Sequence, residues 1–418
     1  MSNVEAGREP TGLARLCQFV IRHSTFLTLL GQSSVQTIYF DYNATTPLDP
    51  AVREAMLPYL GEVFGNPSSV HHVGRRARSL LDDARDRVAR VWGAKPSEVV
   101  FTSGGTESTN LALLGAARLL RDKGRHIITS AIEHHAVLHC CQYLAKREGF
   151  EVTYLPVNSD GLVSVEELRA ALRPDTVLVS VMAANNETGT LQPVAELGAL
   201  CRARGVLFHT DAVQWFGKEP FASVHQFNAD LVSVCAHKFY GPKGAGALFI
   251  RSPLLPDPIL FGGGHENERR AGTENLAGII GFADATERFV KTPVFPREPL
   301  TALTGRLLSF LDTLQDQGVT VRGSRTLRLA NTVAFTVRGC DSISLLAGLD
   351  LEGICASSGS ACSAGSLEPS HVMLALGADS ASANALVRLS LGRESTSEEI
   401  ARVENILPEV IRRAQRFQ

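Results

Sequence analysis

The stretch "LVSVCAHKFYGPKGAGALFIR", residues 231–251, combines two apolar, β-branched runs with a glycine-rich turn between them. We predict a buried strand for each run, "LVSVCA" (231–236) and "GALFIR" (246–251). Five upstream runs of the same kind are also predicted as buried strands: "EVVFTSG" (98–104), "HIITSAI" (126–132), "EVTYLPV" (151–157), "TVLVSVMAAN" (176–185) and "VLFHTDA" (206–212). These runs make seven strands in all.

Segments with helical periodicity lie between several of these strands, for example "STNLALLGAARLLRDKG" (108–124) and "PVAELGALCRARG" (193–205). Strands and helices that alternate in this way are typical of a mostly parallel α/β sheet with helices on both faces. We therefore predict a large domain with a seven-stranded sheet over residues 54–295. Ligands of such sheets bind at the carboxyl ends of the strands.

The pattern changes after residue 294, where a long amphipathic segment leads to two strand-like runs and a final helix. These segments are "LTALTGRLLSFLDTLQDQ" (300–317), "NTVAFTVRG" (331–339), "ALVRLSLGR" (385–393) and "SEEIARVENILPEVIRRAQ" (397–415). We predict a smaller α+β domain made of residues 38–53 and 296–418. Residues 1–37 are interpreted as an extension outside the fold. A transit peptide is the alternative, since Arg8, Arg15 and Arg22 outnumber Glu5 and Glu9.

The composition excludes several classes of protein. The 418 residues are 44% hydrophobic and 20% charged, with a formal net charge of -2 and no basic stripe, so nucleic acid is not an expected partner. No apolar run reaches the roughly 20 residues that span a membrane. The eight cysteines have no zinc-type spacing, so we predict no metal site and a reduced, cytoplasmic protein.

Lys238 differs in its setting from other lysines of the chain. Lys95, Lys123 and Lys146 fall in turns or helix ends beside charged residues, as surface amines do. Lys238 directly follows the predicted strand 231–236, at its carboxyl end. A lysine amine that is partly removed from water can form a Schiff base with a carbonyl cofactor. Lys238 is therefore the candidate for such chemistry.

Pyridoxal phosphate would need three further groups, and each occurs after a predicted strand. "FTSGGTES" (101–108) enters a helix that we expect to start at Thr106, and helix N-termini bind phosphate. Asp211 ends the strand 206–212 and is a candidate partner of the pyridinium nitrogen. His134, in "IEHHAV", is a candidate to stack on the ring. Each signal alone also fits a plain turn, a helix cap or a structural histidine, but their order on successive strand ends favours the cofactor site.

With these motifs in place, the sequence resembles the NifS/IscS group of pyridoxal-phosphate-dependent cysteine desulfurases, within the class V aminotransferases. The resemblance runs from Ile38 to the C-terminus and implies the fold-type I architecture of pyridoxal-phosphate enzymes. The matching blocks are "YFDYNATTPLDP", "FGNPSS", "FTSGGTES", "EHHAV", "NNETG", "TDAVQ", "HKFYGPKGAGALFIR", "GGGHENERRAGTEN", "SSGSACSAGSLEPSHV" and "VRLSLGR".

The resemblance implies a role for each matching residue. Lys238 corresponds to the Schiff-base lysine that moves the substrate's α-proton, and His134 to the stacking histidine that also shuttles protons. Other positions correspond to cofactor ligands: Asp211 at the pyridinium nitrogen, Gln214 and Asn186 at the 3-hydroxyl, Gly105, Thr106 and His237 at the phosphate, and Thr273 at the phosphate from the other subunit of a homodimer. Arg388, with Asn186, would bind the substrate, because its planar fork suits a carboxylate.

One position departs from the family. Cys235 stands three residues before Lys238, where the family usually has a serine that binds the phosphate. A thiol is a weaker donor than a hydroxyl. We therefore expect looser phosphate binding at this position but no loss of the cofactor. We consider a second sulfur-carrying site at Cys235 the weaker alternative.

The resemblance also implies a nucleophile, Cys362, in "SSGSACSAGS" (357–366). Its thiolate would take the sulfur of L-cysteine as a persulfide and leave L-alanine. The glycine- and serine-rich composition predicts a loop able to carry this sulfur from the cofactor to an acceptor protein. Cys355 is assigned to packing and His371 to a helix start. His265, Glu266 and Glu268 are assigned to a subunit-interface loop and not to a metal.

The expected activity is therefore cysteine desulfurization for iron–sulfur cluster assembly or another thiolation, with an iron–sulfur scaffold as one possible acceptor. Three alternatives remain open at this point: a selenocysteine lyase, a plain aminotransferase, and a scaffold that has lost the cofactor. The long cysteine loop favours the desulfurase over the lyase.

Overall fold

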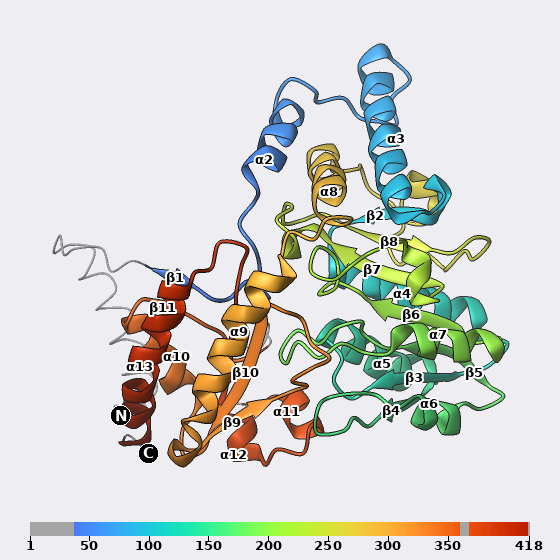
Figure 1. The fold of residues 1–418 in the computed structure, drawn as a ribbon. Coiled ribbons are helices and arrows are strands. Elements are labelled where there is room, and N and C mark those ends of the chain that lie inside the picture. Colours follow the sequence, from blue (N-terminus) through green and yellow to red (C-terminus); the bar gives the residue numbers. More distant parts are fainter. Residues whose placement is uncertain (1–36, 360–367, 417–418) are drawn as a thin grey trace, which may run out of the picture. The chain divides into compact units, whose positions relative to one another are not determined.

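The computed structural model describes residues 37–359 and 368–416. Its largest sheet has seven strands, and their chain order fits the sequence prediction (Figure 1). Across the sheet the strands are β2 (Val99–Thr102), β8 (Gly246–Ile250), β7 (Leu231–Cys235), β6 (Leu207–Asp211), β5 (Thr176–Ser180), β3 (His126–Ser130) and β4 (Glu151–Leu155). The pairs from β7 to β4 are parallel, and β8 is antiparallel to both of its neighbours. The predicted mostly parallel sheet is confirmed.

Alternate strand residues pack on opposite faces of this sheet. In β2, Val100 belongs to one buried cluster, whereas Val99 and Phe101 belong to another. Ile127 and Ile128 of β3 divide in the same way. Because side chains alternate along a strand, an apolar run without polar interruption needs cover on both sides. Apolar residues on both faces explain why these strands are short continuous runs and do not alternate with polar residues.

Helices cover both faces. On one side α4 (Gly105–Leu120) and α5 (His135–Glu148) contribute their apolar residues to the same cluster as Val100. On the other side lie α3 (His72–Trp92), α7 (Val194–Ala203) and α8 (Leu276–Phe289), and Figure 1 shows α3 and α8 next to each other. Two shorter helices, α2 (Pro50–Met56) and α6 (Val165–Ala171), pack against α8 and α7 respectively.

One predicted buried strand is not buried. In β4, Glu151 and Tyr154 are exposed, and only Leu155 is buried. β4 is the last strand at its edge of the sheet and pairs only with β3. Edge position alone does not expose a strand, because β2 at the other edge is buried along its whole length. In β4 the exposed side chains are the charged Glu151 and the amphipathic Tyr154. The prediction that all seven strands are buried was therefore wrong for β4.

The C-terminal part of the chain forms a separate antiparallel sheet in the order β12 (Leu386–Ser390), β10 (Thr332–Val337) and β9 (Val319–Arg322). The sequence pattern predicted β10 and β12 but not β9. A short parallel pair joins β1 (Ile38–Tyr39) to β11 (Ile354–Cys355). The helices here are α9 (Arg297–Asp312), α10 (Ser342–Leu351), α11 (His371–Ala375), α12 (Ser380–Ala383) and α13 (Ser397–Arg416). The two larger sheets fall on opposite sides of the predicted boundary near residue 295, which stays a prediction.

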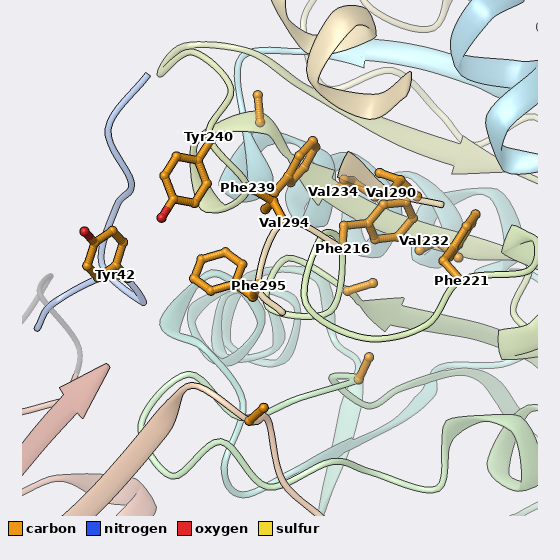
Figure 2. Packing of buried hydrophobic residues seen from close by; sticks show 14 of the residues in the cluster. Tyr42, Phe216, Phe221, Val232, Val234, Phe239, Tyr240, Val290, Val294 and Phe295 are labelled. Carbon is orange, nitrogen blue, oxygen red and sulfur yellow. The ribbon is translucent and has the colours of Figure 1, made fainter. Parts of the chain in front are cut away.

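An aromatic cluster connects the N-terminal segment to the region beside the large sheet (Figure 2). The ring centroid of Tyr42 lies 6.2 Å from that of Tyr240 and 6.4 Å from that of Phe295. Tyr240 and Phe295 are themselves 5.6 Å apart. Aromatic pairs at these distances add to the stability gained by burial. The cluster holds residues 40–46 against the end of β7. In the described part of the chain, no helix is long and apolar enough to cross a membrane.

Candidate active site

A cavity of about 230 Å³ opens at the carboxyl ends of the parallel strands. Ten residues that the sequence predicted for the site line it: Gly105, Thr106, His134, Asn186, Asp211, Gln214, Cys235, His237, Lys238 and Arg388. They come from segments as far apart as the start of α4 and the middle of β12. The carboxyl ends of parallel strands meet at one edge of a sheet, which explains why the residues that follow these strands share one cavity, whereas Arg388 reaches it from the separate antiparallel sheet.

Lys238 lies in the cavity wall, in the short 3-10 turn that follows β7. Its Nζ donates hydrogen bonds to the carbonyl oxygens of Asn43 and Ala44, each at 2.7 Å. Burial lowers the pKa of Lys238, and the nearby Arg388 lowers it further, while Cys235 opposes this effect. Burial disfavours the charged form of an amine. The lysine is therefore biased toward the neutral amine that attacks carbonyl groups.

Asp211 ends β6 and is buried in the cavity wall. Its Oδ1 accepts a hydrogen bond from the backbone N–H of Val213 at 3.0 Å. Burial raises the pKa of Asp211 to about 6, although Lys238 pulls it down. A buried carboxylate gains from a cation placed next to it. Asp211 can therefore stabilise a protonated ring nitrogen in the cavity.

His134 occupies the N-cap of α5 and lines the cavity. Its Nδ1 accepts a hydrogen bond from the backbone N–H of Ala136 at 3.1 Å, so the neutral ring carries its proton on Nε2. Burial lowers the pKa of His134 to about 4, and Lys238 contributes to this shift. The imidazole is therefore neutral near pH 7, as a flat stacking partner and proton carrier requires.

The N-terminus of α4 lies at another part of the cavity wall. The helix begins at Gly105, one residue before the predicted start at Thr106, and Gly104 has a φ of 154° that favours glycine. A Cβ at Gly105 would lie 2.7 Å from Val213 Cγ2, so this position has room only for glycine. The free N–H groups and the dipole of a helix N-terminus attract anions. This part of the cavity is therefore suited to a phosphate.

His237 and Cys235 lie on the strand side of the same cavity. His237 Nδ1 is 3.1 Å from Thr45 Oγ1, and burial, with Lys238, lowers the pKa of His237 to about 4. Burial raises the pKa of Cys235 to about 11, which keeps it a neutral thiol. A buried neutral thiol is a weak hydrogen-bond donor and a poor nucleophile. These features favour phosphate contact over sulfur transfer at Cys235.

Arg388 is buried in β12 and already has partners in the protein. Its Nη1 donates to the carbonyl oxygens of Asn186 and Gly359, at 2.8 and 2.7 Å, and its Nη2 donates to Asp41 Oδ1 at 2.7 Å. A guanidinium has five N–H groups, so Nε–H and one Nη2–H remain. Nε has no hydrogen-bond partner among the described residues. Arg388 therefore keeps one pair of donors for a carboxylate.

Two residues of the cavity region had no role in the sequence prediction. Asn43 lines the cavity, and its carbonyl accepts from both Lys238 and Gln214 Nε2. Lys218 is buried beside it and donates to Asn43 Oδ1 at 2.6 Å. Asn43 falls in the block "YFDYNATTPLDP", and Lys218 lies four residues after the last residue of "TDAVQ". Their place in or near matching blocks was the available signal, but spacing gave no reason to connect them.

Two predicted residues are not part of this cavity. Thr273 is exposed and lines a second cavity of about 170 Å³, with Ser103 and Gly244 among its neighbours. Cys362 lies outside the described residues. Thr273 was predicted to reach the site of another subunit, and that role stays a prediction, as does the role of Cys362.

Three further predictions concern residues near the cysteine loop and the loop 262–275. His371 is the first residue of α11, as predicted, and its Nε2 lies 2.9 Å from the carbonyl oxygen of Glu133. Cys355 pairs with Tyr39 in the β1–β11 ladder and is only partly buried. Glu266 forms a buried ion pair with Arg85 at 2.6 Å. Within the described chain, no group of three or more His, Cys, Asp and Glu residues is arranged to hold a metal ion.

Comparison with known proteins agrees with this geometry. The sequence model of the aminotransferase class-V family matches residues 38–403. The cysteine desulfurase IscS of Methanosarcina thermophila is 48% identical over 378 residues, which cover 90% of this chain and 93% of the relative. A solved NifS-like protein has a TM-score of 0.82 at 38% identity and covers 90% of this chain and 99% of its own.

A second solved structure, described as SspA in complex with cysteine, has a TM-score of 0.74 at 36% identity, and the match covers 86% of this chain and 100% of that one. Enzymes of the class V aminotransferase family generally depend on pyridoxal phosphate. The family match covers most of the chain, and the named relative is similar over nearly its whole length. The chain belongs to the aminotransferase class-V family and, within it, to the cysteine desulfurases.

Proposed function

We propose that this protein is a pyridoxal-phosphate-dependent cysteine desulfurase that uses Lys238 to hold the cofactor and Cys362 to receive sulfur. One observation carries the proposal: a buried lysine, a buried carboxyl group and the N-terminus of a 16-residue helix meet in a single cavity. A phosphorylated pyridine aldehyde needs these three groups at its three ends.

The residues present fit the cofactor. The phosphate would lie at the N-terminus of α4, with Gly105, Thr106 and His237, and the ring would lie between His134 and Asp211. Gly105 is the first residue of α4 and lines the cavity, so the free backbone N–H groups of the helix start lie where the phosphate would bind. Gln214 and Asn186 would face the ring hydroxyl. When bound, pyridoxal phosphate withdraws electrons from bonds at the substrate's α-carbon.

The substrate would be L-cysteine, with its carboxylate on Arg388. The remaining Nε–H and Nη2–H of Arg388 are two donors on one planar group, which is the arrangement that binds a carboxylate bidentately. Asp41 and the carbonyls of Asn186 and Gly359 hold the guanidinium in place. Because Nε is buried, a carboxylate would reach it only after a local rearrangement around Arg388.

Two groups would move protons in the cavity. Burial lowers the pKa of Lys238 below its usual value, which favours the neutral amine that can accept a proton. His134 carries a proton on Nε2 and is neutral, so it can support a second transfer. Both side chains are held by hydrogen bonds to backbone groups of the protein. Their fixed positions favour transfer at the substrate and not to bulk water.

Cys362 would receive the sulfur. It is three residues beyond Gly359, which lines the cavity and bonds to Arg388, and three residues reach roughly 10 Å when extended. The Cys362 thiolate would attack the substrate sulfur and form an S–S bond. The C–S bond breaks with its electron pair kept on carbon, which takes up a proton to leave L-alanine. The persulfide sulfur would then pass to an acceptor thiol, for example on an iron–sulfur scaffold protein.

We test this function with Lys238→Ala and Cys362→Ala. Without Lys238 the purified protein should lose the visible absorption of the bound cofactor. Without Cys362 it should keep that absorption but form no L-alanine above background from L-cysteine and a thiol. Cys355→Ala is the matched control, because Cys355 is in the same region and pairs only with β1; it should keep its rate.

Full L-alanine production by Cys362→Ala would contradict the desulfurase mechanism. A much faster reaction with L-selenocysteine in that variant would instead favour a lyase. Transfer of the amino group to a keto acid without release of sulfur would favour an aminotransferase.

We further propose that the protein is a cytoplasmic homodimer. Thr273 is exposed and does not line the cavity of its own chain, as expected for a residue donated to a second copy. Phe64, Val70 and Phe261 are at least 80% exposed, and a contact with a second copy would remove apolar surface of this kind from water. Light scattering of the purified protein measures its mass in solution, and a monomer would contradict this proposal.

A further inference from the structure

Lys218 is a buried lysine next to the cavity. Only 3% of its surface is exposed, and among the described residues it forms no ion pair with a carboxylate. Its Nζ instead donates to two amide oxygens, Asn43 Oδ1 at 2.6 Å and Gln214 Oε1 at 2.5 Å. Lysine is rarely fully buried without a charged partner, so its two amide acceptors need an explanation.

The two acceptors are the ends of side chains that can flip. Rotating a terminal amide by 180° exchanges its oxygen and its NH₂ group, which are similar in shape but opposite in hydrogen bonding. An ammonium has donors only, and Nζ is the donor in both contacts, so each amide has its oxygen toward Lys218. A neutral amine and an ammonium both have the two hydrogens that this requires.

The remaining hydrogen bonds agree with this orientation. Gln214 Nε2 donates to the carbonyl oxygen of Asn43 at 2.9 Å. Asn43 Nδ2 donates to Thr332 Oγ1 at 2.9 Å. The Asn43 carbonyl also accepts from Lys238 Nζ. A continuous chain of hydrogen bonds thus runs from Lys218 through Gln214 and Asn43 to Lys238.

This network decides which group Gln214 presents to the cavity. Gln214 lines the cavity, whereas Lys218 is not among its lining residues. With Oε1 held by Lys218, the Nε2 group has a second hydrogen for an acceptor in the cavity. A flipped Gln214 would present an oxygen there and repel an anionic oxygen. Lys218 therefore acts on the cavity through Gln214 and not by direct contact.

We propose that Lys218 is a positioning residue that fixes the amide of Gln214 as a hydrogen-bond donor toward the 3-oxygen of pyridoxal phosphate. The proposal rests on the proposed function, because it needs the cofactor in this cavity. A donor at this oxygen would stabilise its negative charge and would lower the pH at which the cofactor held by Lys238 loses its proton. Lys218 thus sets the pH at which that proton is lost.

The test is the pH titration of the cofactor's visible absorption in reconstituted protein. Lys218→Met keeps the length of the side chain but removes both donors. We expect the midpoint of the titration to rise by about one pH unit. A shift of this size corresponds to the free energy of one hydrogen bond to a charged group. Cofactor affinity, measured by titrating apo-protein, should fall about tenfold for the same reason.

A double-mutant cycle separates positioning from a direct charge effect. Gln214→Leu removes the donor itself and should raise the midpoint as Lys218→Met does. Because Lys218 acts through Gln214, Lys218→Met should add little in the Gln214→Leu background. A shift that stays the same in both backgrounds would mean that Lys218 acts by its charge and would overturn the proposal.

Phe295→Leu is the matched packing control, since the Phe295 ring lies 5.1 Å from Lys218 Nζ but makes neither amide bond. It should leave the midpoint unchanged, and a shift equal to that of Lys218→Met would overturn the proposal. If Lys218→Met does not fold, Lys218→Gln should give a smaller shift in the same direction, and no shift would overturn it. If Lys218→Met has the same titration midpoint as the wild type, this inference is overturned but the proposed function is not. A wild-type chain that gains no visible absorption with pyridoxal phosphate overturns the proposed function as well.

Discussion

Glu133 is a buried carboxyl group directly before His134. Its Oε1 accepts hydrogen bonds from Ser130 Oγ at 2.5 Å and from the Met182 backbone N–H at 2.9 Å. Its Oε2 has no hydrogen-bond partner within the residues that the structure describes. Burial raises the pKa of Glu133 to about 8, so the group is protonated at neutral pH. A protonated carboxyl avoids the cost of a buried, unpaired charge.

Glu133→Gln should therefore change the pH dependence of stability. Because the pKa of Glu133 is higher in the folded state, the protonated group contributes to the free energy of unfolding. This contribution is fully present below the unfolded pKa of 4.5 and is lost as the pH rises through about 8. Glutamine cannot ionise. Between pH 5 and 8 the wild type should lose stability relative to Glu133→Gln by about 1.4 kcal/mol per pH unit.

Denaturant unfolding of both proteins across this pH range measures the difference between them. Parallel curves for the two proteins would mean that Glu133 is ionised in the folded state. The comparison between variants cancels the contributions of other buried groups, such as His209, whose pKa burial lowers to about 3.

Among the secondary-structure elements, a buried ion pair joins α3, β2 and the turn 265–268. Arg85, in α3, donates to both carboxylate oxygens of Glu266, at 2.7 and 2.6 Å. Arg85 Nη1 also donates to the carbonyl of Val99, and the backbone N–H of Phe101 donates to Glu266 Oε2 at 2.9 Å. Glu266 adopts a positive φ of 49°, which is uncommon for a non-glycine residue. These contacts hold the turn against the first strand of the large sheet.

Arg85→Met should destabilise the protein by about 3–5 kcal/mol, because it leaves the Glu266 carboxylate buried without its partner. Glu266→Met should also destabilise it, since Phe101 N–H loses its acceptor. The loss of unfolding free energy in the double variant should be smaller, by at least about 1 kcal/mol, than the sum of the losses in the two single variants. Unfolding free energies of the four proteins give this coupling, and simple additivity would contradict a role for the pair.

The comparison between prediction and structure is clearest for the strands. Short, mostly apolar runs located all seven strands of the large sheet, because strands covered on both faces are rich in apolar residues. The same pattern did not reveal that β4 is an edge strand, since edge position depends on strand order. β9 was missed because its alternation of apolar and polar residues, "VTVR", extends over only four residues.

At the scale of the whole molecule, the site depends on chain segments that are distant in sequence. Asn43, Gln214 and Arg388 come from the N-terminal segment, the end of β6 and β12, and all line the same cavity. Thr273 is the one predicted cofactor ligand among the described residues that does not reach it. In the proposed homodimer, a site would be completed only by Thr273 of the second copy.

Mixing two inactive or weakened variants tests this arrangement. Lys238→Ala alone and Thr273→Val alone should each give poor cofactor binding. After unfolding and refolding together in equal amounts, half of the dimers contain one copy of each. Each mixed dimer then has one site with an intact Lys238 and an intact Thr273 from the other copy. We expect about a quarter of the wild-type number of tight sites, as closed twofold symmetry predicts.

A mixture that binds no better than the Thr273→Val protein alone would show that each chain completes its own site. Titration of the mixture with pyridoxal phosphate, followed by its visible absorption, measures the number of tight sites. A mixture refolded from the two variants separately is the control, because it contains no mixed dimers at the start.

The sequence by itself determined the strand–helix alternation, the family, and the place of Lys238, Asp211 and His134 at strand ends, because local pattern fixes where a parallel strand stops. It alone assigns Cys362, which lies outside the described residues. Only the tertiary structure decided that Arg388 is held by Asp41 and that Lys218 reaches Asn43, 175 residues away. Such contacts depend on how distant segments pack. A buried amine needs hydrogen-bond acceptors, and the tertiary structure determines which acceptors lie close enough to it.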